Sequence, residues 1–530
     1  MLSTQTQTRT LDGNTVTIED VVAVAREQEN TYLSNQAEKK MAASNELKET
    51  LISTKQPIYG VTTGFGDSCK RQISPEKTIE LQRNMVHFQL NGVGPITNEE
   101  TTRATMLVRA NCLAKGNSGI RPIVVKQLIE YINRGILPLI PERGSLGASG
   151  DLVPLSYIAS ALIGEGDVLY KGKVRDVKDV LQEEGLEPVI LEAKEGLALI
   201  NGTSFMSGFA TLAISDAEEL AFVADLCTAM ASEALLGNRA HFNKFIFEEK
   251  PHLGSLKSGG NISSFLSDSK LSRDYSQILS ANDSIAENGY LELDVPIQDR
   301  YSIRCAPHIT GVLYDTLEWA KKWVEIEINS SNDNPLFDIE TSNVLNGGNF
   351  YGGHIAQAMD SLKVAVANIA DLLDRQFELI VDEKFNNGLT PNLIQAVSKD
   401  DYEAGLNHGF KGMQLVISSI TAEALKQSNP SSVFSRSTEA HNQDKVSMGT
   451  MAARDARTIV EIVQNVAAIH LLALCQAADL RGVDKLSSTT RKVYDLIRKD
   501  IPFVDKDRRM DTDIQHVVSL IRQRVFSKNI

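Results

Sequence analysis

Long stretches without proline are the feature that most restricts how this chain can fold. Proline is scarce, 15 in 530 residues, and the segments 204–236, 355–381 and 446–480 contain none while keeping apolar residues at helical spacing. Because proline breaks a helix interior, each segment predicts one continuous helix, roughly 40–50 Å long at 1.5 Å per residue. Three such helices predict a mainly α protein built on a bundle of long, nearly parallel helices.

The first 203 residues show a different pattern, in which short helices alternate with glycine-bearing loops. Periodicity and end signals predict helices over 18–27, 39–54, 76–91, 99–114 and 121–134, and an extended segment over 135–142. The loops 58–66 and 144–150 each carry three glycines, and 238–293 is polar and rich in serine. We therefore expect two domains, residues 1–203 and residues 204–530.

Charge, cysteine and histidine usage argue against several protein classes. Acidic residues outnumber basic ones, 68 to 54, for a net charge of −14, which disfavours binding to nucleic acid. No CxxC occurs and no two histidines are four residues apart, so we expect neither a disulfide framework nor a metal site. Residues 1–14 are polar and no apolar run reaches about 18 residues, so we expect a cytoplasmic protein with no membrane segment.

The loop 144–150, which reads GSLGASG, allows two interpretations. A glycine-rich loop before a helix is often a tight turn or an anion-binding turn. Alternatively, the loop undergoes backbone chemistry at Ala148-Ser149-Gly150, where the bare amide nitrogen of Gly150 can approach the carbonyl of Ala148. Ring closure and loss of two waters would then give a 4-methylidene-imidazol-5-one (MIO), with the Ser149 side chain as the methylidene.

Residues 144–156, GSLGASGDLVPLS, resemble the signature of the aromatic amino acid ammonia-lyases and aminomutases. The resemblance recurs in five blocks, from about Val16 to the C-terminus. It implies a histidase/fumarase-like long-helix fold with an N-terminal MIO-bearing domain. It also implies MIO formed autocatalytically from Ala148, Ser149 and Gly150 with no external cofactor, and a homotetramer whose sites combine residues from three subunits.

The resemblance implies three further catalytic residues. Tyr59 matches the base, Asn201 a residue that hydrogen-bonds the electrophile or the substrate, and Tyr301 the tyrosine that polarises the imidazolone region. A phenolate can remove a weakly acidic benzylic proton once the site lowers the tyrosine pKa below about 10. Without the motif, Tyr59 would be interpreted as a half-buried tyrosine that packs a loop.

Further positions match residues that bind the substrate. Arg304 and Asn334 match contacts to its carboxylate, a role that suits the bidentate guanidinium; an isolated arginine would otherwise be expected in a surface ion pair. The other matches are a polar residue that lines the site, an aromatic beside the electrophile, and two residues around the amine and electrophile: Gln298, Phe350, Glu439 and Gln443.

Three positions bear on the ring of the substrate. Phe88 offers no polar partner and favours a phenyl ring, Gln89 could hydrogen-bond a para hydroxyl, and Leu152 would pack against the ring. Histidine is disfavoured by resemblance, because the Ser-His pair of histidine enzymes is absent at 88–89 and Gln443 replaces their glutamate. We therefore predict a phenylalanine ammonia-lyase that forms trans-cinnamate, with some tyrosine activity open. The alternatives are an aromatic amino acid 2,3-aminomutase and an inactive helical scaffold.

Overall fold

The computed structural model describes residues 8–282 and 289–530; residues 1–7 and 283–288, parts of the polar N-terminus and of the serine-rich segment 238–293, lie outside the described residues. The chain divides into two compact units, each assembled from three segments. Unit 1 comprises Met1–Ser215, Ala320–Asp360 and Pro430–Arg457, and unit 2 comprises Asp216–Trp319, Ser361–Asn429 and Thr458–Ile530. The expected domains are continuous in sequence, and a boundary at 203/204 stays a prediction.

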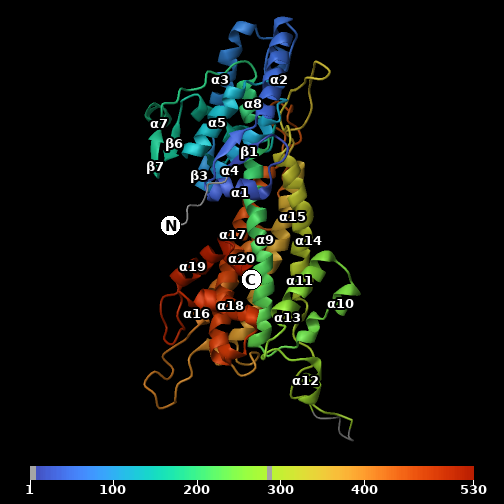
Figure 1. Ribbon diagram of the computed structural model, residues 1–530, viewed down its shortest axis with the longest axis vertical. Helices are drawn as coiled ribbons and strands as arrows, with labels where there is room; N and C mark the ends of the chain where they lie inside the picture. Colours follow the sequence, from blue (N-terminus) through green and yellow to red (C-terminus); the bar gives the residue numbers. More distant parts are fainter. Residues whose placement is uncertain (1–7, 283–288) are drawn as a thin grey trace. The chain divides into compact units, whose positions relative to one another are not determined.

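Unit 1 contains the short helices of the first 200 residues (Figure 1). They are α1 Ile18–Arg26, α2 Asn35–Ser53, α3 Thr78–Phe88, α4 Glu99–Ala114, α5 Pro122–Arg134, α6 Leu152–Leu162, α7 Val177–Glu184 and α8 Glu195–Ile200. Local signals explain their ends: Thr17 and Asp20 form a capping box on α1, and α5 begins at Pro122 and stops at Gly135, which has a φ of 66°. The predicted helices in this part are confirmed with shifts of a few residues.

Small sheets complete unit 1. The strands are β1 Arg9–Leu11, β2 Thr31–Leu33, β3 Val93–Ile96, β4 Leu137–Pro138, β5 Pro141–Arg143, β6 Asp167–Tyr170, β7 Lys173–Asp176, β8 Leu336–Asp338 and β9 Asn343–Leu345. The pairs β1–β2, β3–β5 and β8–β9 and the three-stranded order β4–β6–β7 are antiparallel, except for the parallel β1–β2. The predicted extended segment 135–142 contains β4 and begins β5.

Among the described residues, four long helices each contribute residues to both units, because a boundary between the units falls within each helix. They are α9 Ser204–Ala234, α14 Ala306–Ile328, α15 Gly353–Val381 and α17 Gly449–Arg481. Three were predicted, and they begin and end within three residues of the expected positions. The fourth, α14, was not predicted. Its Pro307 lies in the first turn, where proline costs no helical hydrogen bond.

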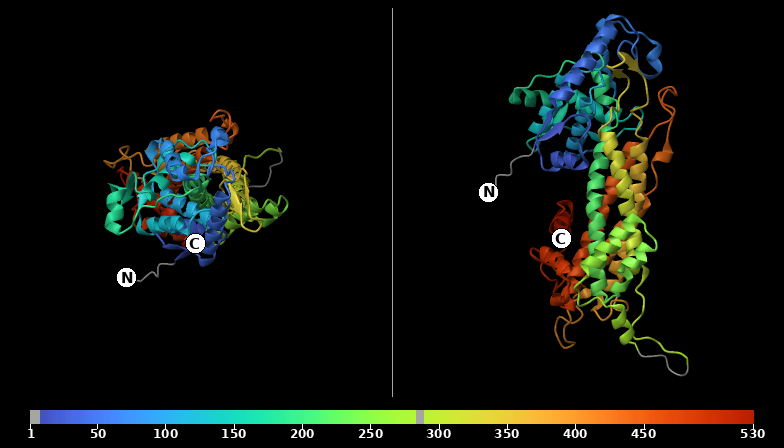
Figure 2. Two further views of the ribbon diagram at one scale, coloured as in Figure 1. Left: turned by 90° about the horizontal axis from the view of Figure 1, so that it is seen from above. Right: turned by 45° about the vertical axis from the view of Figure 1, so that its right-hand side comes forward.

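Unit 2 surrounds its parts of the long helices with shorter ones. These are α10 Lys244–Glu248, α11 Leu253–Phe265, α12 Tyr275–Ser280, α13 Tyr301–Arg304, α16 Lys411–Gln427, α18 Ser488–Arg498, α19 Asp511–Arg522 and α20 Val525–Asn529. Within this unit α9, α14 and α15 run side by side (Figures 1 and 2). The prediction of a mainly α, long-helix architecture is confirmed.

Within residues 8–282 and 289–530, one helix, α17, has the length and apolar composition needed to cross a membrane. However, 78% of its most apolar stretch is buried inside the protein. This burial is typical of the core helix of a bundle, so α17 gives only weak support for a membrane segment.

Candidate active site

The loop between β5 and α6 has a backbone conformation that is rare for residues other than glycine. Ser149 has a φ of 54° and Gly150 a φ of 78°, both in the left-handed region. A Cβ added to Gly150 would lie 2.1 Å from the backbone oxygen of Gly202. Position 150 therefore has to be glycine for the loop to pack against the 201–202 segment.

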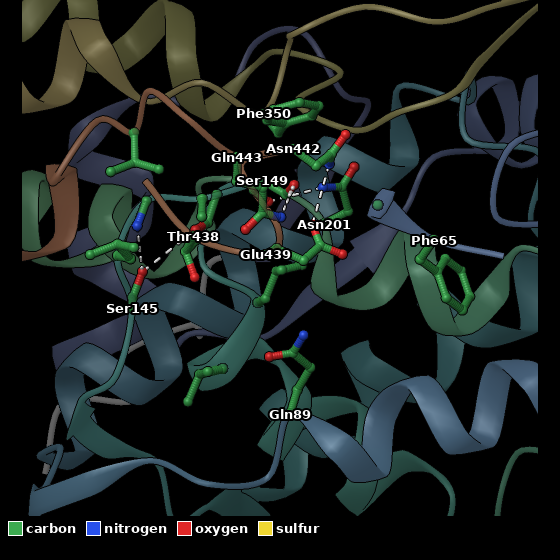
Figure 3. Close-up of a pocket in the computed structure, with 18 of the residues that line it drawn as sticks. Phe65, Gln89, Ser145, Ser149, Asn201, Phe350, Thr438, Glu439, Asn442 and Gln443 are labelled. Carbon is green, nitrogen blue, oxygen red and sulfur yellow. Dashed lines mark hydrogen bonds between the residues drawn. The ribbon is translucent and has the colours of Figure 1, made fainter. Parts of the chain in front are cut away.

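Ser149 is held at both its carbonyl and its hydroxyl (Figure 3). Its carbonyl oxygen accepts hydrogen bonds from Asn201 Nδ2 at 2.9 Å and from the Gly202 amide at 3.2 Å. Gln443 Nε2 lies 3.2 Å from Ser149 Oγ. Asn201 Oδ1 is buried and has no hydrogen-bond partner within the described part of the chain. Two donors thus stabilise negative charge on the Ser149 carbonyl oxygen, and an acceptor beside them stays available.

Asp151 connects this loop to the two helices that flank it. The carboxylate is fully buried and accepts hydrogen bonds from the Ser145 hydroxyl at 2.7 Å, from the Met206 amide at 2.8 Å, and from the Thr450 hydroxyl. Burial raises the pKa of Asp151, while these hydrogen bonds oppose the shift. The loop, the first turn of α9 and the first turn of α17 are therefore fixed relative to one another within unit 1.

A cavity of about 550 Å³ opens over Ser149, entirely within unit 1. It brings together twelve of the fifteen residues singled out from the sequence: Tyr59, Phe88, Gln89, Ala148, Ser149, Gly150, Leu152, Asn201, Asn334, Phe350, Glu439 and Gln443. Other lining residues were not singled out from the sequence, among them Phe65, Ser145, Thr438 and Asn442 (Figure 3). All four lie inside or next to the blocks that carry the resemblance, which is the signal that could have found them.

Tyr59 lies at the wall of this cavity on a loop whose neighbours anchor it. Ile58 and Val61 are buried against Phe337 of β8, and the Tyr59 hydroxyl accepts a hydrogen bond from the Gly66 amide at 2.9 Å. Burial raises the pKa of Tyr59, and the Glu439 charge adds to this, against the hydrogen bond from Gly66. The surroundings in unit 1 therefore raise the tyrosine pKa, whereas the expected base needs it lowered.

Glu439 lies next to Tyr59 at the start of a tightly turned segment. Residues 439–441 all have a positive φ, between 51° and 64°, and the Glu439 carboxylate packs against the backbone of Gly66. Asn442 Nδ2 donates to Glu439 Oε2 at 3.2 Å. This turn brings Glu439 and Gln443 into the cavity together, and backbone strain of this kind is common at functional sites.

Three of the fifteen residues do not line this cavity. Gln298, Tyr301 and Arg304 lie in unit 2 and line a different cavity of about 600 Å³. The Tyr301 side chain is 71% exposed; the Arg304 guanidinium stacks over its ring at 4.6 Å, and Arg304 Nε donates to the Asp299 backbone oxygen at 3.0 Å. The chain alone therefore presents the residues expected to act together in two separate places.

Comparisons with known proteins agree with this geometry. Residues 16–499 match the family model "Aromatic amino acid lyase". A histidine ammonia-lyase of Bacillus cytotoxicus is 38% identical over 98% of both chains. Among solved structures, tyrosine aminomutase from Streptomyces globisporus is 36% identical over 98% of both chains, with a TM-score of 0.92. Histidine ammonia-lyase from Trypanosoma cruzi is 32% identical, with a TM-score of 0.87, over 98% of this chain and 94% of that one.

These findings correct the predicted substrate. The prediction of a phenylalanine ammonia-lyase that forms trans-cinnamate is wrong, because several curated relatives that match nearly the whole chain are named histidine ammonia-lyase. Phe88, at the end of α3, was the residue that favoured a phenyl ring. It lines the cavity, and its side chain is 56% exposed in the single chain. The coarser prediction of a carbon–nitrogen lyase stands.

Proposed function

The chain belongs to the aromatic amino acid lyase family, and from this premise we propose that it eliminates ammonia from L-histidine to give trans-3-(imidazol-4-yl)acrylate. The proposed chemistry is supported mainly by the surroundings of Ser149. Its carbonyl oxygen accepts two hydrogen bonds, and the residue lines a cavity of about 550 Å³. The substrate follows from the names of the relatives.

The loop residues fit the MIO group that the family uses. Gly150 has no room for a Cβ, Ser149 already has a left-handed φ, and Asn201 Oδ1 is a buried acceptor without a partner among the described residues. Once formed from Ala148, Ser149 and Gly150, this group would supply an electrophilic carbon beside the substrate. We propose autocatalytic formation, without an external cofactor.

The other cavity residues would bind the substrate and move its protons. Asn334 would contact the carboxylate and Glu439 the ammonium group, and Phe350 would pack beside the reacting carbons. Tyr59 would take the β proton as the amine leaves. Leu152 would contact the ring, and an imidazole needs both a donor and an acceptor, which the amides of Gln89 and Gln443 each supply.

Three residues would reach the substrate from other copies of the chain. We propose a cytoplasmic homotetramer, in which Arg304, Gln298 and Tyr301 complete the cavity of a neighbouring subunit. A guanidinium near Tyr59 would also lower the tyrosine pKa, which the surroundings in unit 1 raise.

A product-resolved assay tests the proposal. Purified protein is incubated with L-histidine, L-tyrosine or L-phenylalanine, and the products are identified by NMR, while intact mass is measured on the same sample. We expect the imidazolylacrylate and ammonia from histidine, and a chain lighter by two waters whose mass deficit Ser149→Ala abolishes. A β-amino acid would instead indicate migration of the amino group, and the full calculated mass would overturn the mechanism.

A further inference from the structure

A fully buried arginine contacts the Asn201–Gly202 segment, which supplies both hydrogen-bond donors to the Ser149 carbonyl oxygen. Arg109, on α4, has a side chain that is 0% exposed. Its Nη1 donates to the backbone oxygen of Asn201 at 3.0 Å and to Asn332 Oδ1 at 3.3 Å. Its Nε and Nη2 have no hydrogen-bond partner among the residues that the structure describes. Burial of a guanidinium with so few partners opposes folding, so packing alone does not explain it.

Arg109 and Ser149 contact opposite ends of the same peptide group. The carbonyl of Asn201 accepts from Arg109, and the amide of this peptide, that of Gly202, donates to the Ser149 oxygen at 3.2 Å. A cation at the carbonyl draws electron density toward that oxygen and leaves the amide hydrogen more positive. Hydrogen bonds in series strengthen one another in this way, particularly where water is excluded.

The close approach depends on the glycine at position 202. A Cβ added there would lie 2.1 Å from Arg109 Nη1 and 2.6 Å from Asn332 Oδ1. The Asn332 side chain fixes the guanidinium from the other side, since its Nδ2 donates to Thr203 Oγ1 at 2.8 Å. The arginine is therefore held against this one peptide.

We propose that Arg109 is a positioning residue that polarises the Asn201–Gly202 peptide toward the Ser149 carbonyl oxygen. The proposal rests on the MIO chemistry of the proposed function and assigns Arg109 to the formation and later use of that group. Arg109 does not line the cavity, and its Nη1 bonds to Asn201 and Asn332 rather than to Ser149.

Polarisation of the Asn201–Gly202 peptide would act on the dehydration of Ser149. Its Cα–H bond breaks, the electron pair forms the Cα–Cβ double bond, and Oγ leaves with two hydrogens as water. Loss of the Cα proton places negative charge on the Ser149 carbonyl oxygen, which Gly202 and Asn201 hold. The other water comes from ring closure: the nitrogen of Gly150 bonds to the carbonyl carbon of Ala148, whose oxygen leaves with the amide hydrogens of Ser149 and Gly150.

Intact mass and kinetics of Arg109→Met give the first test, because methionine keeps the length and removes the charge. We expect a measurable fraction of folded chains to keep one or both waters. We also expect kcat to fall roughly tenfold with little change in KM, less than the loss of about 10²–10³-fold when a direct oxyanion donor is removed. The matched control is Arg103→Met, a buried arginine on the same helix, which should behave like the unsubstituted protein.

The pH profile of Arg109→Lys gives a readout that a purely structural role would not change. Burial lowers the pKa of Arg109, against the charges of Cys112, Asp333 and Asp151, and Lys194 is a further charged neighbour. The guanidinium stays charged regardless, but a buried amine can lose its proton near neutral pH. We therefore expect kcat of Arg109→Lys to fall as the pH rises, on a limb that the unsubstituted protein lacks.

The outcomes separate this proposal from the proposed function. Complete dehydration with unchanged kcat in Arg109→Met overturns the role of Arg109, as do equal deficits in Arg103→Met. If Arg109→Met does not fold, a pH profile of Arg109→Lys parallel to that of the unsubstituted protein overturns it. An unsubstituted chain with its full calculated mass overturns the proposed function itself, and with it the role of Arg109.

Discussion

At the scale of single residues, position in a motif and physical environment give different information about Tyr59. The motif assigns it the role of base, whereas burial and the nearby Glu439 carboxylate raise its pKa in the isolated chain. The two agree only if a cation from elsewhere approaches the hydroxyl. The hydroxyl itself is well placed, since it lines the cavity and is held by the Gly66 amide.

Tyr59→Phe should separate the base from the formation of the electrophile. Removal of the hydroxyl should lower kcat/KM by about 10²–10⁴-fold, the usual contribution of a general base, while the chain still lacks two waters by intact mass. Tyr131→Phe is the control, because its buried hydroxyl donates to the Ala161 carbonyl, away from the cavity. Retention of full activity in Tyr59→Phe would assign proton removal to another group.

At the scale of elements, a buried carboxylate joins three helices of unit 2. Asp225 of α9 is fully buried and accepts hydrogen bonds from the Ser258 hydroxyl, from Asn261 Nδ2 at 2.9 Å and from the Tyr314 hydroxyl at 2.9 Å. The first two residues lie on α11 and Tyr314 on α14. Burial raises the pKa of Asp225 to about 7, against these hydrogen bonds and the charge of Lys257.

This shift predicts that the stability of unit 2 depends on pH through Asp225. Because the folded pKa is raised, the stabilising contribution is complete below about pH 4 and is lost as the pH rises toward 7. The melting temperature of Asp225→Asn relative to the unsubstituted protein should therefore increase by a few degrees between pH 5 and pH 8. Asp274→Asn, at an exposed carboxylate paired with Arg239, is the control. An Asp225→Asn difference that is constant with pH would contradict the prediction.

At the scale of the whole molecule, the residues expected to act on one substrate lie in two units. Ser149 and Tyr59 line a cavity of unit 1, and Arg304 and Tyr301 line another in unit 2. We interpret this separation through assembly: in a homotetramer each site would combine unit 1 of one chain with unit 2 of others.

Mixing two inactive variants tests this interpretation. Ser149→Ala and Arg304→Ala are each expected to be inactive, but refolding them together should restore activity. If different chains supply the two residues, about one quarter of the sites in an equal mixture would have both intact. Mixing either variant with itself is the control, and the absence of recovery in mixed tetramers would place both residues in the same chain.

The helical architecture and much of the candidate site could be predicted from sequence patterns alone. Helix periodicity, proline scarcity and capping residues are local properties, so three of the four long helices and the short helices α1 to α5 of unit 1 were predicted. Glycine at 150 and the GASG motif located the loop that lines the cavity for the same reason, since the proposed chemistry involves three consecutive residues. The predicted phenylalanine activity was wrong: it was argued from the side-chain types at a few positions such as Phe88, whereas relatives that match nearly the whole chain are named for histidine.

The surroundings of the loop 144–150 depend on how distant parts of the chain pack together. The hydrogen bonds from Gln443 and Asn201 to Ser149 join residues 294 and 52 positions apart, and the Arg109 bond to Asn201 spans 92 positions. No local pattern encodes such pairs, because they depend on how helices pack across the core. The same packing gives Tyr59 its raised pKa and places Arg304 in another unit, since burial and distance are properties of the folded chain.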